Sequence, residues 1–190
     1  METINILIAG VGGQGILLTS KIIGHLAIDL GYDVKISEVH GMAQRGGSVV
    51  THVRFGKKVN SPLIEIGKAD IIMVFEKLEA LKYTHYLTDE GIMIVNDHRI
   101  DPLPVALGYS EYPDNVEGKI CENCPESIII DALKIARELG NDRVLNTVLL
   151  GVLAKQLDIE RDKWLKAIEE NVPPRTIDLN KNAFLIGFDK

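Results

Sequence analysis

The chain has 190 residues, of which 46% are hydrophobic and 25% are charged, and its formal net charge is −6. This length and composition are typical of a soluble α/β domain with its own core, and they exclude a disordered chain and a membrane-spanning protein. The negative charge, with no cluster rich in lysine and arginine, excludes nucleic acid as the expected partner. From the length we expect one domain over residues 1–190. No signal-peptide pattern opens the sequence, so we expect the protein in the cytoplasm and not at a membrane.

The first expected element is an apolar strand at residues 4–9, which runs directly into a glycine-rich loop. The loop has the pattern Gly-x-Gly-x-x-Gly and consists of Gly10, Val11, Gly12, Gly13, Gln14 and Gly15. These glycines permit a sharp turn and a close approach of a ligand or partner, and the N–H groups of the following helix favour an anion. The same glycines also serve tight packing with nothing bound, and the pattern leaves both interpretations open.

A helix is expected at residues 13–30, where apolar residues recur at helical spacing, and Gly31 ends it. A second strand at residues 34–39 completes a β-α-β unit with two parallel strands. Glu38 lies near the end of this strand, where dinucleotide-binding folds place the acidic residue that holds the ribose. The glycine-flanked loop at residues 40–48 does not fit the turn into a helix that such folds require, which weakens the nucleotide interpretation.

Further strands and helices follow from apolar runs and helical spacing. The expected strands are residues 49–55, 71–75 and 92–96. Two helices are expected at residues 76–86 and 125–139. Two more helices follow, one capped by Asn141 or Asp142 and one that begins at a cap by Asp158 and ends at Pro173. In the helix at residues 76–86, Glu79 is expected to point outward. Residues 97–123 are expected to be loop-rich with short strands around residues 105–107, and residues 182–188 to form a closing strand or to lie on a partner. The resulting fold is a three-layer α/β domain: a Rossmann-like open sheet, mostly parallel, with extra C-terminal helices.

Cys121 and Cys124 are the two cysteines of the chain and form a lone Cys-x-x-Cys pair. Such a pair can be a redox couple, half of a metal site or two ordinary thiols. Zinc and iron–sulfur sites normally need four ligands, and the nearest histidine, His98, lies more than twenty positions upstream. We therefore expect no metal site and interpret the pair as structural.

The side chains with the greatest potential for chemistry are Glu38, His40, Arg45, His52 and Glu76. The sequence does not place any two of them together as acid and base, and it contains no nucleophile elbow, zinc-protease motif or phosphate loop. His52 lies in the middle of a strand, where packing is the expected role. His40 and Arg45 lie in a loop where open α/β sheets receive ligands, which favours a functional role, and the alternative for Arg45 is a solvated loop charge. No catalytic residue is identified in this chain alone.

Two motifs carry a resemblance to a known family. They are Gly-Val-Gly-Gly-Gln-Gly at residues 10–15 and Ser-Glu-Val-His-Gly-Met-Ala-Gln-Arg-Gly-Gly-Ser-Val at residues 37–49. With both motifs, the chain resembles the γ-type subunit or domain of the 2-oxoacid:ferredoxin oxidoreductases, and the second motif is most similar to the β subunit of indolepyruvate:ferredoxin oxidoreductase. The resemblance covers essentially the whole chain. The His-Gly-Met-Ala-Gln portion, which pyruvate-specific relatives usually lack, favours the arylpyruvate branch.

The resemblance implies a subunit of an enzyme that decarboxylates indolepyruvate or other arylpyruvates oxidatively to acyl-CoA and passes the electrons to ferredoxin. It implies that thiamine diphosphate and the iron–sulfur clusters lie on a separate large subunit and that CoA is a co-substrate. It also implies that ferredoxin is reached through the complex, and that this chain alone holds no cofactor and is inactive. The lone cysteine pair departs from the family's pattern.

The two loops are expected to form one surface that docks against the thiamine-bearing subunit and helps to shape its substrate or CoA site. We expect them to meet because they follow the carboxyl ends of what should be adjacent parallel strands. The residues predicted for this surface are Gly10, Gly12, Gly13, Gln14, Gly15, His40, Arg45, Gly46, Gly47 and Ser48. Two other functions stay open from the residues alone: a dinucleotide-binding protein that uses residues 10–15 and Glu38, and a non-catalytic α/β interaction module.

Overall fold

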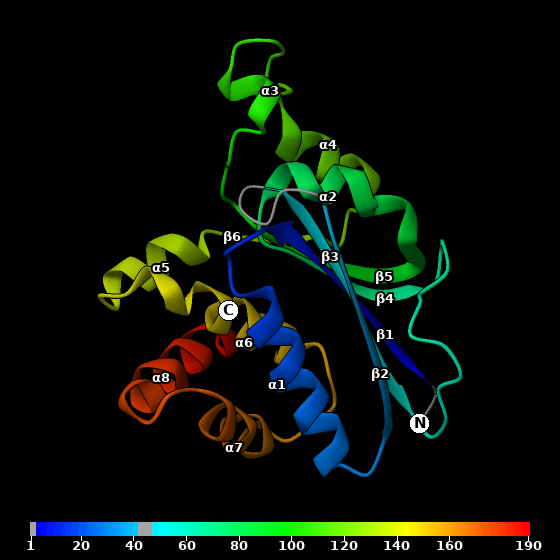
Figure 1. The fold of residues 1–190 in the computed structure, drawn as a ribbon, viewed down its shortest axis with the longest axis vertical. Coiled ribbons are helices and arrows are strands. Elements are labelled where there is room, and N and C mark those ends of the chain that lie inside the picture. The colour runs from blue at the N-terminus through cyan, green and yellow to red at the C-terminus, as the bar shows by residue number, and fades with distance from the viewer. Residues whose placement is uncertain (1–2, 42–46) are drawn as a thin grey trace.

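In the computed structural model, which describes residues 3–41 and 47–190, six strands form one sheet in the order β2-β3-β1-β4-β5-β6 (Figure 1). The strands are β1 (Ile4–Val11), β2 (Asp33–His40), β3 (Ser48–Gly56), β4 (Ala69–Val74), β5 (Leu87–Asn96) and β6 (Ile128–Ile130). β1, β4, β5 and β6 pair in parallel, whereas β3 pairs antiparallel with both β1 and β2. Of these six strands only β3 runs against the others, which confirms the mostly parallel, Rossmann-like sheet predicted from the sequence.

Helices cover both faces of the sheet and produce three layers (Figure 1). The first face carries α1 (Ile16–Asp29), α5 (Ala132–Glu138), α6 (Leu145–Lys155), α7 (Arg161–Asn171) and α8 (Ile177–Phe188), and the second face carries α2 (Lys77–Tyr83) and α4 (Val116–Asn123). The short helix α3 (Leu103–Ala106) projects beyond α4. No helix in the described part of the chain combines the length and apolar character needed to cross a membrane.

The centre of the sheet is β1, whose side chains are apolar on both faces. Ile6 and Ile8 belong to the core of the first face, and Leu7 and Ala9 belong to the core of the second. All four are fully buried, as expected of a strand covered by helices on both sides. This strand fixes the position of the glycine loop that follows it.

β1 and β2 run parallel, as the β-α-β unit predicts, but they are not neighbours. β3 lies between them, and Val53 of β3 stands opposite Ile6 on one side and Ile36 on the other. β3 is largely buried on both faces and takes the inner position, whereas β2 is half-buried or exposed and forms the edge of the sheet. The expectation that the two loops follow adjacent parallel strands is therefore wrong.

Residues 128–130, predicted inside a helix, form β6 instead. These three residues are consecutive isoleucines, and Ile128 and Ile129 pair with Ile94 and Val95 of β5. β-branched side chains fit a strand better than a helix, and pairing with a buried neighbour decides the outcome. The helix then starts at Ala132 after Asp131, whose carboxylate accepts a hydrogen bond of 2.8 Å from the Lys134 N–H.

Four more expectations for the second half of the chain are wrong. α3 occupies the region predicted as short strands around residues 105–107, and α8 occupies residues 182–188, where a closing strand was one prediction. α4 forms within the expected loop region, and α7 begins after Glu160 and not at a cap by Asp158. In α8, Ala183 and Phe184 are fully buried on the first face, so long-range packing decides the state of a segment with little periodicity of its own.

α6 and α8 cross in direct backbone contact at two glycines. A Cβ atom added to Gly187 would lie 2.0 Å from the carbonyl oxygen of Val148, and one added to Gly151 would lie 2.1 Å from that of Phe184. Beside the crossing, the Thr147 hydroxyl donates a hydrogen bond of 2.7 Å to the Asn180 side-chain oxygen. The absence of a Cβ at both glycines therefore lets α8 close over the first face.

Candidate functional site

The candidate site lies at the carboxyl edge of the sheet, where β1 and β4 end side by side. The chain leaves β1 through the glycine loop to α1 on the first face, and it leaves β4 through Phe75 and Glu76 to α2 on the second face. A point where neighbouring parallel strands send their helices to opposite faces is where open α/β sheets bind ligands. The glycine loop thus stands at the switch point of this fold.

Gln14 closes the crevice between the two strands. Its Oε1 accepts a hydrogen bond of 2.7 Å from the Val11 N–H, and its Nε2 donates one of 2.9 Å to the Phe75 carbonyl. A Cβ atom at Gly10 would lie 2.7 Å from Gln14 Oε1 and 2.8 Å from Phe75 Cβ. Gly10 therefore serves packing around a glutamine that spans the crevice.

Gly13 and Gly15 adopt the left-handed backbone conformation, with φ of 102° and 89°. A Cβ atom at Gly15 would meet the side chain of Asn146 at 2.9 Å, whereas one at Gly13 would meet no atom within 4 Å. Gly15 is the N-cap of α1 and offers no side chain to the first N–H groups of that helix. Gly15 thus packs against α6, while Gly13 presents open backbone at the end of the helix dipole.

A cavity of 540 Å³ opens beside this loop on the α1 side. Gly13, Gly15 and Leu18 line it from the loop and α1, and His98 and Arg143 line it from two other segments. The cavity combines an apolar wall, a guanidinium group, an imidazole and the N-terminal end of a helix of 14 residues, and its one carboxylate, Asp142, pairs with Arg137. Such a lining suits an anionic group attached to an apolar body.

The second predicted loop meets the first one. The Gly12 N–H donates a hydrogen bond of 3.0 Å to the Gly47 carbonyl, and the Gly41 N–H donates one of 3.1 Å to the Ser48 carbonyl. Ser48 also pairs with Val11 in the sheet. The described ends of the second loop therefore lie on the same edge as the first loop, as predicted, although β3 and not an adjacent parallel strand brings them together. Residues 42–46, with Arg45 and Gly46 among them, lie outside the described residues.

Ser48 is held by a carboxylate that the sequence pattern had assigned to the surface. The Ser48 hydroxyl donates a hydrogen bond of 2.6 Å to Glu79 Oε2, and the Lys82 ammonium pairs with Glu79 Oε1. Glu79 is 4% exposed, so the prediction of an outward side chain is wrong. Its charge is tolerated because both oxygens have partners. The signal that sequence reasoning missed is a serine 31 positions away, which no helical periodicity reveals.

Glu38 and His40 pair with each other on β2. His40 Nε2 lies 2.6 Å from Glu38 Oε1, and the Thr51 hydroxyl donates a hydrogen bond of 3.1 Å to Glu38 Oε2. Because β3 separates β2 from β1, Glu38 lies two strands away from the glycine loop. Its engaged oxygens and its distance in the sheet do not support a ribose-binding role.

Glu76 and His52 serve packing. Glu76 is 1% exposed and accepts hydrogen bonds from the backbone of α2 and Ile100 and from the Tyr112 hydroxyl at 2.7 Å. Burial and the Glu76 carboxylate raise the pKa of Tyr112 above its usual range.

His52 is buried, and its Nδ1 accepts a hydrogen bond of 3.1 Å from the Ile64 N–H. Burial, with a smaller contribution from the Arg54 charge, lowers the pKa of His52. The packing interpretation of His52 is confirmed.

Cys121 and Cys124 lie at the end of α4, and both are free thiols. Cys121 is exposed, whereas Cys124 is buried in the core of the second face, and burial raises the pKa of the Cys124 thiol. A high pKa disfavours the thiolate that redox chemistry and metal binding use. The geometry supports the structural interpretation of the buried member of the pair.

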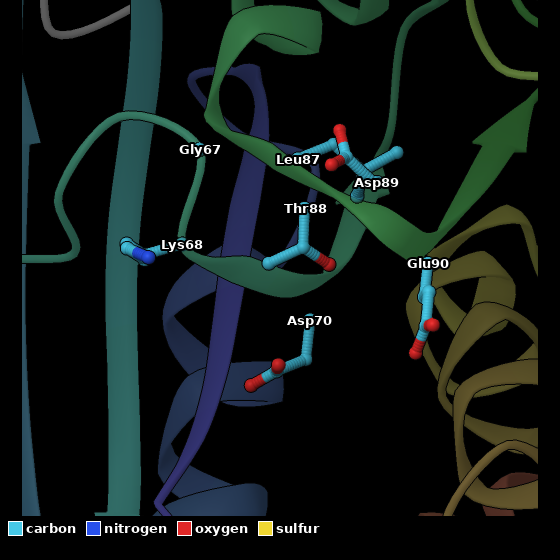
Figure 2. A pocket seen from close by; sticks show the side chains of 7 residues that line it. All are labelled: Gly67, Lys68, Asp70, Leu87, Thr88, Asp89 and Glu90. Atoms are coloured by element: carbon cyan, nitrogen blue, oxygen red, sulfur yellow. The ribbon is translucent and has the colours of Figure 1, made fainter.

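A second open cavity, of 530 Å³, lies near the opposite edge of the sheet at the start of β4 and β5. In Figure 2 the side chains of Asp89 and Glu90 project from β5 in different directions, and Asp70 accepts a hydrogen bond of 2.7 Å from the Asn5 N–H. These carboxylates do not converge on a common point. The cavity therefore offers less for binding than the carboxyl edge does.

Comparisons with known proteins agree with this architecture. A family model described as pyruvate ferredoxin/flavodoxin oxidoreductase matches residues 5–190. The indolepyruvate oxidoreductase subunit IorB of Thermococcus kodakarensis is 41% identical over 192 residues, which cover 98% of this chain and 95% of that protein.

Two solved structures share the fold. The pyruvate oxidoreductase subunit PORC of Thermotoga maritima has a TM-score of 0.74 at 21% identity, covering 100% of this chain and 97% of its own. A 2-oxoglutarate:ferredoxin oxidoreductase of Magnetococcus marinus, solved with 2-oxoglutarate, coenzyme A and succinyl-CoA bound, has a TM-score of 0.73 at 17% identity. That match covers 100% of this chain and 31% of the other, so the same fold occurs there as part of a longer polypeptide.

Proposed function

The chain belongs to the pyruvate ferredoxin/flavodoxin oxidoreductase family, and from this membership we propose that it is the small subunit of a complex that oxidises indolepyruvate and related arylpyruvates. The support for this substrate class is the 41% identity to an indolepyruvate oxidoreductase subunit over nearly the whole of both chains. The proposed reaction is oxidative decarboxylation to an acyl-CoA, with electrons passed to ferredoxin through the complex. The proposal treats residues 1–190 as one domain in the cytoplasm.

We place thiamine diphosphate and the iron–sulfur clusters on a large partner subunit, because this chain's residues do not fit either group. A cluster needs four ligands of the thiolate type, and the chain has two cysteines, one of them buried. At the switch point, the Gln14 side chain spans the crevice that a pyrophosphate group would enter. The longer Magnetococcus chain, in which this fold is a minor part, also supports a large partner.

The observation that carries the proposal is an exposed surface at the carboxyl edge, which we call the docking edge. Its described part consists of the loop at residues 10–15, the ends of the second loop at residues 40–41 and 47–48, and the projecting helix α3 with the residues that follow it. Leu103 of α3 lines a cavity of 90 Å³ together with Val11 and Ser48, so the projection is continuous with the loops.

The projection presents large apolar side chains to solvent. Leu103, Leu107 and Tyr109 are 70%, 57% and 82% exposed. Large apolar side chains exposed near one another in a short segment are typical of protein–protein interfaces. We propose that the thiamine-bearing subunit covers them and that the 540 Å³ cavity beside Gly15 then faces its active site. There Arg143 and His98 would hold a carboxylate or phosphate of the oxoacid or CoA.

The test is purification of the native complex through a tag on this chain, followed by assays of the complex and of the isolated chain. We expect a large subunit that carries thiamine diphosphate and iron–sulfur clusters to co-purify, and indolepyruvate to be oxidised by the complex when CoA and an electron acceptor are present. The isolated chain should show no turnover. Turnover by the single chain, or tight binding of NAD or NADP to it, would contradict the proposal and favour a stand-alone function.

A further inference from the structure

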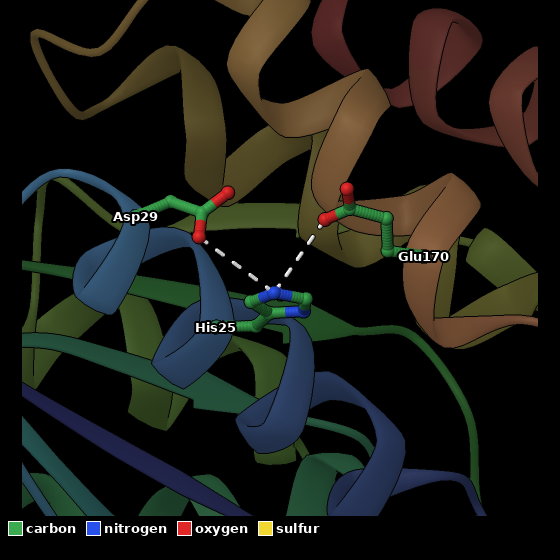
Figure 3. A group of neighbouring side chains, drawn as sticks. All are labelled: His25, Asp29 and Glu170. Atoms are coloured by element: carbon green, nitrogen blue, oxygen red, sulfur yellow. Dashed lines mark ion pairs between the residues drawn. The ribbon is translucent and has the colours of Figure 1, made fainter.

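Away from the docking edge, the described residues contain one group of three side chains whose ligand atoms converge: His25, Asp29 and Glu170. His25 and Asp29 lie one turn apart on α1, and Glu170 lies on α7, so the group connects two helices of the first face (Figure 3). Each side chain is about one-third exposed, at 36%, 37% and 37%. An ion and a water ligand therefore have access from solvent.

The spacing of the three ligand atoms fits a small metal ion. His25 Nε2 lies 3.7 Å from Asp29 Oδ1 and 3.5 Å from Glu170 Oε2, and the three atoms lie within 4.8 Å of one another. In a tetrahedral zinc site with bonds of about 2.0–2.1 Å, neighbouring ligand atoms are about 3.4 Å apart. Figure 3 shows both carboxylates directed at the same imidazole nitrogen. Small side-chain rotations would bring all three atoms to bonding distance of one ion.

We propose that His25, Asp29 and Glu170 bind a divalent first-row transition-metal ion, with Zn²⁺ as its best representative and water as the fourth ligand. One imidazole nitrogen with two carboxylate oxygens is a donor set that zinc accepts. Mg²⁺ and Ca²⁺ prefer sites made of oxygen alone and of higher coordination number. The sequence predicted no metal site because these ligands lie on helices that are far apart in the chain.

Lys166 contacts the oxygens that the ion would not use. Its Nζ lies 3.0 Å from Asp29 Oδ2 and 3.6 Å from Glu170 Oε1, so each carboxylate keeps its inner oxygen for the site. Two carboxylates against one ammonium give the group an excess of acidic side chains, which attracts a cation. The Lys166 charge also opposes the ion, so its removal is expected to tighten binding.

Asn171 orients the imidazole ring. Its side-chain nitrogen lies 2.6 Å from His25 Nδ1 and also donates a hydrogen bond of 2.8 Å to the Ala167 carbonyl. Binding of a metal at Nε2 moves the imidazole proton to Nδ1, where a turned Asn171 amide would accept it through its oxygen. The ion would then fasten α1, which begins at the glycine loop, to the C-terminal helices.

The test is calorimetric titration and thermal melting of the full chain with Zn²⁺ and Mg²⁺, after removal of any affinity tag. All proteins carry Cys121→Ser, because this exposed thiol would otherwise bind zinc. We expect one Zn²⁺ per chain and a melting temperature that rises with Zn²⁺ and not with Mg²⁺. His25→Ala and Glu170→Gln should each weaken Zn²⁺ binding by roughly tenfold or more, and Lys166→Met should strengthen it.

Glu169→Gln is the matched control, since Glu169 is the preceding residue of α7 and pairs with Lys181 outside the group. This variant should bind Zn²⁺ like the parent. The proposal is overturned if the parent gives no saturable one-to-one isotherm, or if His25→Ala binds Zn²⁺ as tightly as the parent. Neither result bears on the proposed oxidoreductase complex, because the group lies outside the docking edge.

Discussion

The two faces of the sheet bury different kinds of polar residue. Under the five helices of the first face, the buried polar side chains are uncharged, for example Thr19, Asn146 and Asn180. Under α2 and α4 on the second face, the buried set contains the titratable residues His52, Glu76 and Glu79. The second face therefore holds buried titratable side chains through hydrogen bonds, and two of them, Glu76 and Glu79, lie beside the docking edge. Substitutions on the first face should change stability, and those near the docking edge should change assembly and activity.

The largest effect is expected from Gly187→Ala on the first face. The added methyl would lie 2.0 Å from the Val148 carbonyl oxygen, so α6 and α8 would have to separate along their crossing. We expect a loss of about 3 kcal/mol or more in the free energy of unfolding, measured by urea denaturation.

The control for this change is Gly24→Ala in α1. There the added methyl meets the end of the flexible Ile36 side chain at 2.8 Å and makes an ordinary contact with Val34 at 3.9 Å. Because alanine has a higher helix propensity than glycine, this variant should be neutral or more stable by up to about 1 kcal/mol. Equal losses in both variants would show that the glycine crossing has no special role.

The second-largest effect is expected from Glu76→Ala on the second face. The change removes the cap of α2 and leaves the Tyr112 hydroxyl and the Ile100 N–H without their acceptor. We expect a loss of about 2–3 kcal/mol in the free energy of unfolding, together with faster proteolysis of the segment at residues 97–115. Glu76→Gln keeps one acceptor oxygen and should lose less. If Glu76→Ala were as stable as the wild type, Glu76 would not hold this segment in place.

The third prediction concerns Arg45, a loop residue whose role rests on the sequence. If its guanidinium holds a carboxylate or phosphate at the partner's active site, losing that contact costs about 1.5–3 kcal/mol. Arg45→Ala should then leave the melting temperature nearly unchanged and lower the activity of the reconstituted complex by about tenfold or more. Wild-type activity with unchanged Michaelis constants for oxoacid and CoA would show that Arg45 is a solvated loop charge.

Leu103→Ser tests the apolar part of the docking edge. Leu103 is 70% exposed in this chain, so its loss should not change the melting temperature. Burial of a leucine side chain contributes about 1.5–3 kcal/mol, and we expect binding of the large subunit to weaken roughly tenfold. Leu63→Ser is the control, because Leu63 is 54% exposed in the connection between β3 and β4. Equal weakening by both changes would contradict a specific contact at α3.

These regions also differ in how far the sequence alone predicts them. β1 and α1 follow from local patterns, because a continuous apolar run and a clear helical spacing each specify one state. β6 and α8 do not, since pairing with β5 and packing on α6 decide their states over long distances. The site shows the same division. The pattern of glycines places the loop correctly, but it does not reveal that Gln14 folds back to Phe75 or that Glu79 holds Ser48.

The smallest effect is the pH dependence contributed by His52 on the second face. Its folded-state pKa is lowered by burial, so the folded protein favours the neutral imidazole that accepts the Ile64 N–H. Between the folded pKa and the usual value of 6.5, the unfolded chain binds more protons than the folded chain. The stabilisation by this hydrogen bond, about 0.5–1.5 kcal/mol, is therefore fully present above pH 6.5 and is lost as pH falls through the folded pKa.

His52→Asn retains an acceptor and cannot titrate, so its stability should depend less on pH below pH 6.5 than that of the wild type. His85→Asn, at an exposed histidine, should behave like the wild type. If urea denaturation between pH 5 and 7 gave the same slope for His52→Asn and wild type, the buried imidazole would not be a source of acid sensitivity on this face.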